Sequence, residues 1–121
     1  MIHSQTEKVV AAVPASVGTS AVTLTIDTLG YDYASVNVAR ASNASTVFAS
    51  VLKIEESDDN STYSAVTGMT GGTDFTIPAV SDTNAVAIVK LDVDTKAKKR
   101  YLKVTATPAV SVNTVVSARL S

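Results

Sequence analysis

The chain has few reactive side chains. It contains no cysteine and no tryptophan, and its single histidine is His3, close to the amino terminus. The absence of cysteine excludes disulfide bonds and thiolate metal ligands. A triad would require a base, a nucleophile and an acid held together, whereas His3 lies in a segment that we expect to be a loose, solvated arm. We therefore expect no catalytic residue, no cofactor, no metal site and no enzymatic activity.

Charge and long apolar runs are also scarce. The formal net charge is −1, so the chain lacks the basic excess with which general nucleic-acid binders displace counterions. No segment approaches the roughly 20 apolar residues of a membrane-spanning helix. The mildly apolar stretch 9–17 is interrupted by Pro14 and follows Glu7, which favours a first strand over a signal peptide. The sequence thus predicts neither a nucleic-acid partner nor a membrane partner.

The residues that are abundant favour β-structure. Val (19), Ala (17), Thr (16) and Ser (14) make up more than half of the 121 residues, whereas Leu numbers only 6. Val and Thr suit a pleated sheet because their branched side chains restrict χ1. Segments such as 22–27, 52–55 and 102–105 place an apolar residue at every second position, which is the period of a half-buried strand. No segment shows a helical period.

Turn residues divide this pattern into strands. We expect strands at 8–13, 21–27, 33–40, 47–56, 62–66, 75–77, 85–93, 100–107 and 113–120. Strand number and spacing of this kind are typical of sandwiches and barrels. The predicted fold is all-β: an antiparallel β-sandwich, with jelly-roll connections preferred and an immunoglobulin-like sandwich as the alternative. The expected organisation is an amino-terminal arm over residues 1–8 and a single domain over residues 9–121.

Two charged clusters have competing interpretations. Glu55, Glu56, Asp58 and Asp59 are interpreted as a solvated hairpin turn, with weak Ca²⁺ binding as the alternative. The basic run 96–100 is interpreted as a solvated turn, with an acidic partner as the alternative. The glycine-rich stretch 68–72 lacks the following helix that a phosphate cradle needs, so we expect a flexible loop there.

Two segments carry a family resemblance. Residues 31–38 (YDYASVNV) and 51–66 (VLKIEESDDNSTYSAV) resemble a strand entry and a hairpin of small structural proteins of tailed bacteriophages. The similarity continues weakly through 75–78 and 99–104. The family that the chain resembles is that of the small jelly-roll capsid decoration, or cement, proteins.

The resemblance implies a role in the virion. Such a protein binds the outer surface of the shell formed by the major capsid protein, stabilises it, and commonly forms a homotrimer. The implied location is the capsid surface of the virion, after synthesis in the host bacterial cytoplasm. The family offers no catalytic residue to carry over.

The residues suggest where such an interface would lie. Strand segments 47–51 and 86–93 are apolar on both faces, which fits a subunit interface as well as a thick core. The amino-terminal arm is a second candidate, because a loose arm can become ordered on docking, and deleting residues 1–8 should then weaken particle binding. The candidate interface residues are Ile2, His3, Gln5, Val47, Ala49, Val51, Val86 and Ile88.

Two other functions remain open at this point. One is a structural part of the tail or of a head fibre, where similar hairpins occur. The other is a carbohydrate-binding or adhesion β-sandwich, although that class usually displays more aromatic residues than the four Tyr and two Phe found here.

Overall fold

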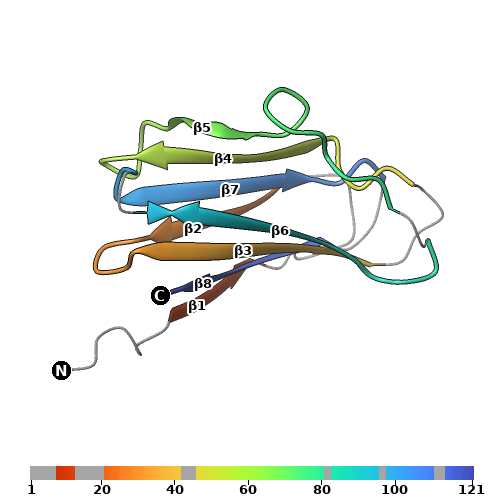
Figure 1. Cartoon of the computed structure of the whole chain (residues 1–121), viewed down its shortest axis with the longest axis horizontal. Coiled ribbons are helices and arrows are strands. Elements are labelled where there is room, and N and C mark those ends of the chain that lie inside the picture. Colours follow the sequence, from red (N-terminus) through yellow and green to blue (C-terminus); the bar gives the residue numbers. More distant parts are fainter. Residues whose placement is uncertain (1–7, 13–20, 42–45, 81–82, 96–97, 111–113) are drawn as a thin grey trace.

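The computed structural model describes residues 8–12, 21–41, 46–80, 83–95, 98–110 and 114–121. Every regular element among them is a β-strand (Figure 1). The strands are β1 (Lys8–Ala12), β2 (Val22–Asp27), β3 (Tyr33–Arg40), β4 (Val51–Ser57), β5 (Ser64–Thr70), β6 (Ala87–Asp94), β7 (Tyr101–Thr107) and β8 (Thr114–Leu120). The predicted all-β class is confirmed.

The strands form two four-stranded antiparallel sheets. The first sheet has the order β1–β8–β3–β6, and the second has the order β2–β7–β4–β5. Strand β1 pairs with β8, β2 with β7, β3 with β6 and β4 with β5. One long hairpin rolled over on itself gives these pairings, which define the jelly roll. The preferred jelly-roll prediction is therefore correct, and the immunoglobulin-like alternative is not.

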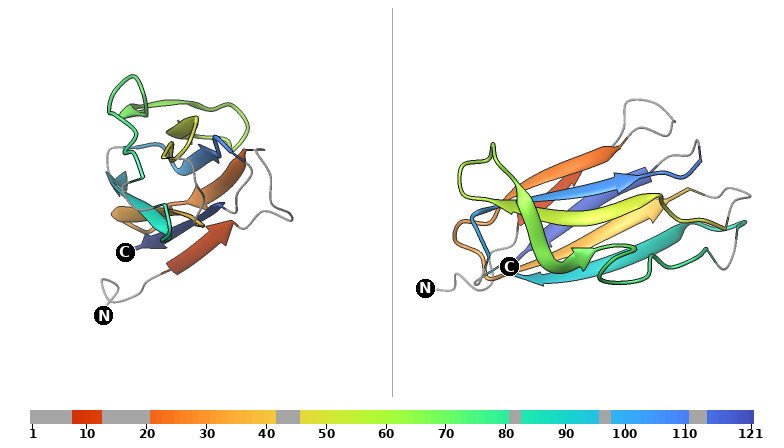
Figure 2. Two further views of the ribbon diagram at one scale, coloured as in Figure 1. Left: turned by 90° about the vertical axis from the view of Figure 1, so that its right-hand side faces the viewer. Right: turned by 90° about the horizontal axis from the view of Figure 1, so that it is seen from above.

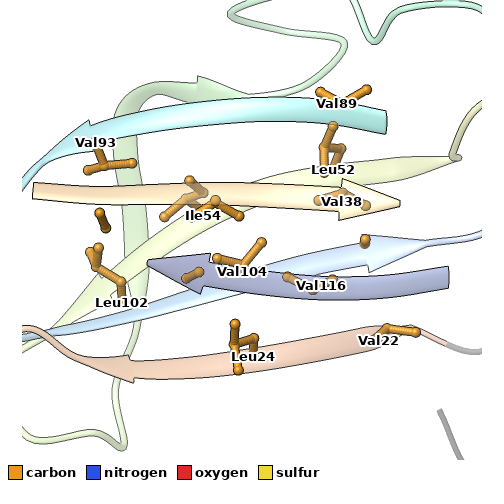
Figure 3. Packing of buried hydrophobic residues seen from close by; sticks show 14 of the residues in the cluster. Val22, Leu24, Val38, Leu52, Ile54, Val89, Val93, Leu102, Val104 and Val116 are labelled. Atoms are coloured by element: carbon orange, nitrogen blue, oxygen red, sulfur yellow. The ribbon is translucent and has the colours of Figure 1, made fainter. Parts of the chain in front are cut away.

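The core lies between the two sheets. Alternate residues of the central strands point inward and are buried, among them Val36, Leu52, Ile54 and Val104. Figure 3 shows Leu52, Ile54 and Val104 packed with other aliphatic side chains between the layers. The inward faces expected at 22–26, 34–38, 102–106 and 116–120 are all buried, because strict alternation defines a face wherever one side of a sheet meets solvent.

Strand β4 begins later than the sequence predicted. Residues 46–50 precede the strand, and Phe48 and Ala49 are both buried although they are adjacent. Successive residues of a regular strand point to opposite faces. The apolar character of this segment therefore comes from an irregular connection that packs over the core, and the strand predicted to start at Val47 starts at Val51.

The segment around the glycines also differs from its prediction. Strand β5 continues to Thr70, through the stretch that was expected to be a loop from Gly68. The short strand predicted at 75–77 does not form, and Phe75 makes only an isolated bridge with Gly71. Phe75 and Ile77 still pack against the core. The alternation of Phe75 and Ile77 correctly predicts that both side chains turn toward the core. It does not show whether another strand pairs with this segment, which is why the predicted strand is wrong.

The two ends of the sandwich carry different connections. Figures 1 and 2 show the turns after β2, β4 and β6 at one end. The ends of β3 and β5 and the starts of β4 and β6 lie at the opposite end. Each end therefore gathers side chains from segments that are distant in the sequence.

Candidate interaction surfaces

One end of the sandwich exposes large apolar side chains. Val47, Val86 and Ile88 are 53%, 61% and 64% exposed. They belong together because Arg40, at the end of β3, pairs with Ala87 and also bonds the carbonyl of Val47. We call Val47, Val86 and Ile88 the apolar end. Exposed apolar groups that cluster in this way mark sites of protein association.

A shallow hollow adjoins the apolar end. It has a volume of about 210 Å³ and lies where the segment 78–80 faces the start of β6. Phe48, Val80, Val86 and Ile88 contribute to its lining. The backbone N–H of Val80 donates to the carbonyl of Thr46 at 2.8 Å, which fixes the two connections to each other. The apolar end thus has a defined shape.

A buried arginine holds this end in place. Arg40 is 0% exposed, although arginine is almost never fully buried without partners. Its Nη1 donates to the carbonyl of Val47 at 2.6 Å, and its Nε donates to the carbonyl of Ala41 at 3.3 Å. These bonds offset part of the cost of removing the charge from water. The guanidinium therefore positions the connection that carries Val47.

The candidate interface residues have three outcomes. Val47, Val86 and Ile88 form the apolar end, and Val51 is exposed at the start of β4. Ala49 is only 6% exposed and belongs to the core, so its side chain is not available to a partner and its selection is corrected. Ile2, His3 and Gln5 lie outside the described residues.

The opposite end carries ion pairs. Arg100 binds Asp27 through two hydrogen bonds of 2.9 and 2.8 Å, and this hydrogen bonding to Asp27 raises the pKa of Arg100. Lys99 lies 3.7 Å from Asp58. Lys99 of the basic run and Asp58 of the acidic cluster therefore lie next to each other at this end.

Asp59 organises the turn between β4 and β5. Its carboxylate accepts hydrogen bonds from the backbone N–H groups of Thr62 and Ser61, both at 2.9 Å, and from the hydroxyl of Ser57 at 2.7 Å. These bonds, that from Thr62 first, lower the pKa of Asp59 to about 2. The carboxylate is thus engaged by its own turn. Among the described residues, no group of three or more acidic or histidine side chains is arranged to hold a metal ion.

Two exposed side chains on the ion-paired end are not among the interface residues that the sequence predicts. Leu29 is 67% exposed in the turn after β2, and Tyr33 is 51% exposed at the start of β3. Tyr33 shares an open hollow of about 520 Å³ with Ser35, Lys90, Asp92 and Arg119 on the outer face of the first sheet. For Leu29, the sequence gives one indication of exposure: it lies in the turn 28–30, where a leucine does not belong to the buried face of a strand. None of the described segments forms a helix long and apolar enough to span a membrane.

Comparisons with known proteins show the fold. No family model and no curated protein sequence matches the chain. The prophage-derived protein YomS of SPBc2 superposes with a TM-score of 0.52 at 12% identity, over 96% of this chain and 95% of that one. A protein of Bacillus endospore appendages, which form disulfide-linked pili, gives 0.47 at 13% identity, over 96% and 87%. The chain is thus similar in fold to a β-protein of prophage origin.

Proposed function

We propose that the protein is a non-enzymatic virion structural protein, specifically a decoration protein that binds and stabilises the outer surface of a phage head. The observation that carries this proposal is the apolar end, where Val47, Val86 and Ile88 are exposed. Buried Arg40 positions this end through its hydrogen bond to the carbonyl of Val47. A rigid jelly roll with one apolar end is suited to docking against another protein surface.

Two further observations support the choice of partner. The residues at 31–38 and 51–66 resemble segments of phage decoration proteins, and jelly rolls are frequent in viral capsids. YomS, which is similar in fold, is itself prophage-derived. Because a fold alone does not define a function, the proposal depends on the residues of the apolar end.

The predicted docking mode places this end against the major capsid protein. The apolar side chains would be removed from water on contact, which is the main favourable contribution to most protein associations. The ion-paired end, with Asp27, Arg100 and Asp58, would then face solvent.

Co-sedimentation with phage heads tests the proposal. Heads of the phage that encodes this chain, stripped of it, should bind the purified protein saturably. Val86→Asp should reduce binding at least tenfold, because a carboxylate would be buried in the contact. Leu29→Asp is the matched control: Leu29 is equally exposed but lies at the other end, so binding should not change. Equal binding by both variants, or no binding to heads, would contradict the docking mode.

One observation favours an alternative. The hollow beside Tyr33 offers hydroxyl, amine and carboxylate groups next to an exposed ring, as a carbohydrate site does. A glycan array separates the two functions, since a decoration protein should bind no glycan there, whereas binding lost in Tyr33→Ala would favour the adhesion function.

A further inference from the structure

Strand β6 forms a regular open edge of the first sheet. It runs for eight residues in unbroken register with β3, and none of the described strands pairs with its other side. The segment 78–80 lies beside the start of β6. The adjacent edge of the second sheet, β5, is irregular: its pairing with β4 shifts between Lys53 and Glu55, and Gly68 has φ +82°. Irregularity of this kind protects an edge from pairing with another chain. Strand β6 lacks that protection.

The hydrogen-bond pattern identifies which backbone groups face outward. The backbones of Tyr33 and Ser121 exchange two N–H···O bonds of 3.0 Å, so the backbone N–H and C=O groups of Tyr33 point toward β8. The direction of these backbone groups alternates from one residue to the next along a strand, so the N–H and C=O groups of Ala34 point toward β6. The Asp32 carbonyl fits the same alternation, because it accepts a hydrogen bond of 2.8 Å from the backbone N–H of Thr95, which follows β6. By the register, Val89, Leu91 and Val93 face β3.

The even-numbered residues of β6 therefore face the open edge. The backbone N–H and C=O groups of Ile88, Lys90 and Asp92 point away from β3. Within the described segments, no backbone hydrogen bond from outside the first sheet reaches these three residues. Their side chains lie on the solvent-exposed outer face. The edge offers a row of donors and acceptors to a further strand.

The charges on β6 fit a second copy of the same strand. Lys90 and Asp92 are two residues apart on the outer face, both are exposed, and within one chain their charged groups lie 3.9 Å apart. If two copies pair antiparallel about a two-fold axis at Leu91, Lys90 of each copy faces Asp92 of the other. This register joins outward-facing residues and uses residues 88–94 of both strands. Opposite charges that face each other across a strand pair are favourable.

The neighbouring registers are less favourable. An axis at Lys90 places Lys90 opposite itself, and an axis at Asp92 places Asp92 opposite itself, so that like charges meet. An axis at Leu91 avoids both conflicts. An axis at Ile88 would pair that residue with itself but would leave most of β6 beyond the contact.

We propose that two copies of the chain associate through β6, antiparallel about a two-fold axis at Leu91, and so join their first sheets into one eight-stranded sheet. The contact is isologous and closed, as in most homodimers. The two apolar ends then point in opposite directions, and Val47 and Val86 of each lie outside the paired residues 88–94. This pairing does not depend on the proposed capsid function, and it differs from the trimer that the resemblance implies.

Charge reversal tests the pairing on the full chain. Light scattering after size exclusion should give twice the 12.5 kDa chain mass. Lys90→Asp and Asp92→Lys should each weaken the dimer at least tenfold, because like charges then face each other. The double variant K90D/D92K should restore it, since the opposite charges are exchanged. Lys53→Asp is the control: Lys53 pairs with Glu55 at the same spacing, but on β4, inside a sheet.

The outcomes are distinct. A dimer that is weakened by each single reversal and restored by the double variant supports the pairing. A monomer at all concentrations would overturn it and assign Lys90 and Asp92 the role of blocking the edge. A trimer, or a dimer that K90D leaves intact, would also overturn it. Circular dichroism spectra of the variants should match those of the parent, which separates loss of pairing from loss of fold.

Discussion

At the scale of single residues, the buried guanidinium of Arg40 is the feature with the largest expected effect. Arg40→Ala removes the donor to the carbonyl of Val47 and leaves a cavity beneath the connection. Unsatisfied buried groups and cavities together cost about 2–5 kcal/mol. Urea unfolding should show a loss of this size, and binding to heads should fall because Val47 loses its anchor.

The matched control for Arg40 is Arg100. Arg100→Ala removes the same side-chain type from an exposed ion pair with Asp27. Exposed pairs contribute little, so the unfolding midpoint should move far less than in the Arg40 variant. Equal losses in the two variants would contradict the anchoring role of Arg40.

Asp59 should make the stability depend on pH. Its pKa is about 2 in the folded protein and 3.8 when unperturbed. A lowered pKa means that the carboxylate stabilises the fold above pH 3.8, and that this contribution is lost as the pH falls toward 2. The melting temperatures of wild type and Asp59→Asn should therefore differ at pH 6 and converge near pH 2. Asp58→Asn leaves the bonds to Asp59 in place and should show no such convergence; a constant gap for Asp59→Asn would contradict the account.

At the scale of elements, the tight connection after β5 depends on one glycine. The N–H of Gly71 donates to the carbonyl of Leu52 at 2.8 Å, and a Cβ on Gly71 would lie 2.7 Å from that same oxygen and from Ile77. Gly71→Ala should therefore cost about 1–3 kcal/mol in urea unfolding. Gly72 has φ +85° and nothing near its Cβ position. Asn adopts that conformation at a lower cost than most residues with a side chain, so Gly72→Asn should cost less than Gly71→Ala. A larger loss at Gly72 would show that backbone conformation, not the close approach, limits this connection.

The same elements show how far the sequence predicts the structure. Alternation at 22–26 and 34–38 identified the buried faces, because one side of each strand meets solvent. It could not identify where strand β4 starts, since Phe48 and Ala49 are both apolar and both buried outside a strand. It could not identify Arg40 as buried either, because no local pattern reveals the carbonyl of Val47 as its partner. The interface prediction for Ala49 fails because the apolar segment 47–51 was predicted to be a regular strand, in which Ala49 would face away from Phe48.

At the scale of the whole molecule, the jelly roll separates three surfaces. Val47, Val86 and Ile88 lie at one end, the Asp27–Arg100 pair lies at the other, and the open edge of β6 runs between them. The proposed docking to a capsid and the proposed pairing with a second copy would therefore share only Ile88 of the apolar end. Val86→Asp should weaken docking at least tenfold without changing the solution mass, whereas K90D should change the mass without weakening docking. Loss of both properties in either variant would contradict this separation.

Electron cryomicroscopy of phage particles tests the central claim most directly. Under the proposed function, particles of the encoding phage would be compared with particles in which the gene for this chain is deleted. The account predicts a difference density on the outer surface of the head, fitted by the jelly roll with its apolar end against the capsid shell. Density confined to the tail, or no difference between the two particles, would contradict it.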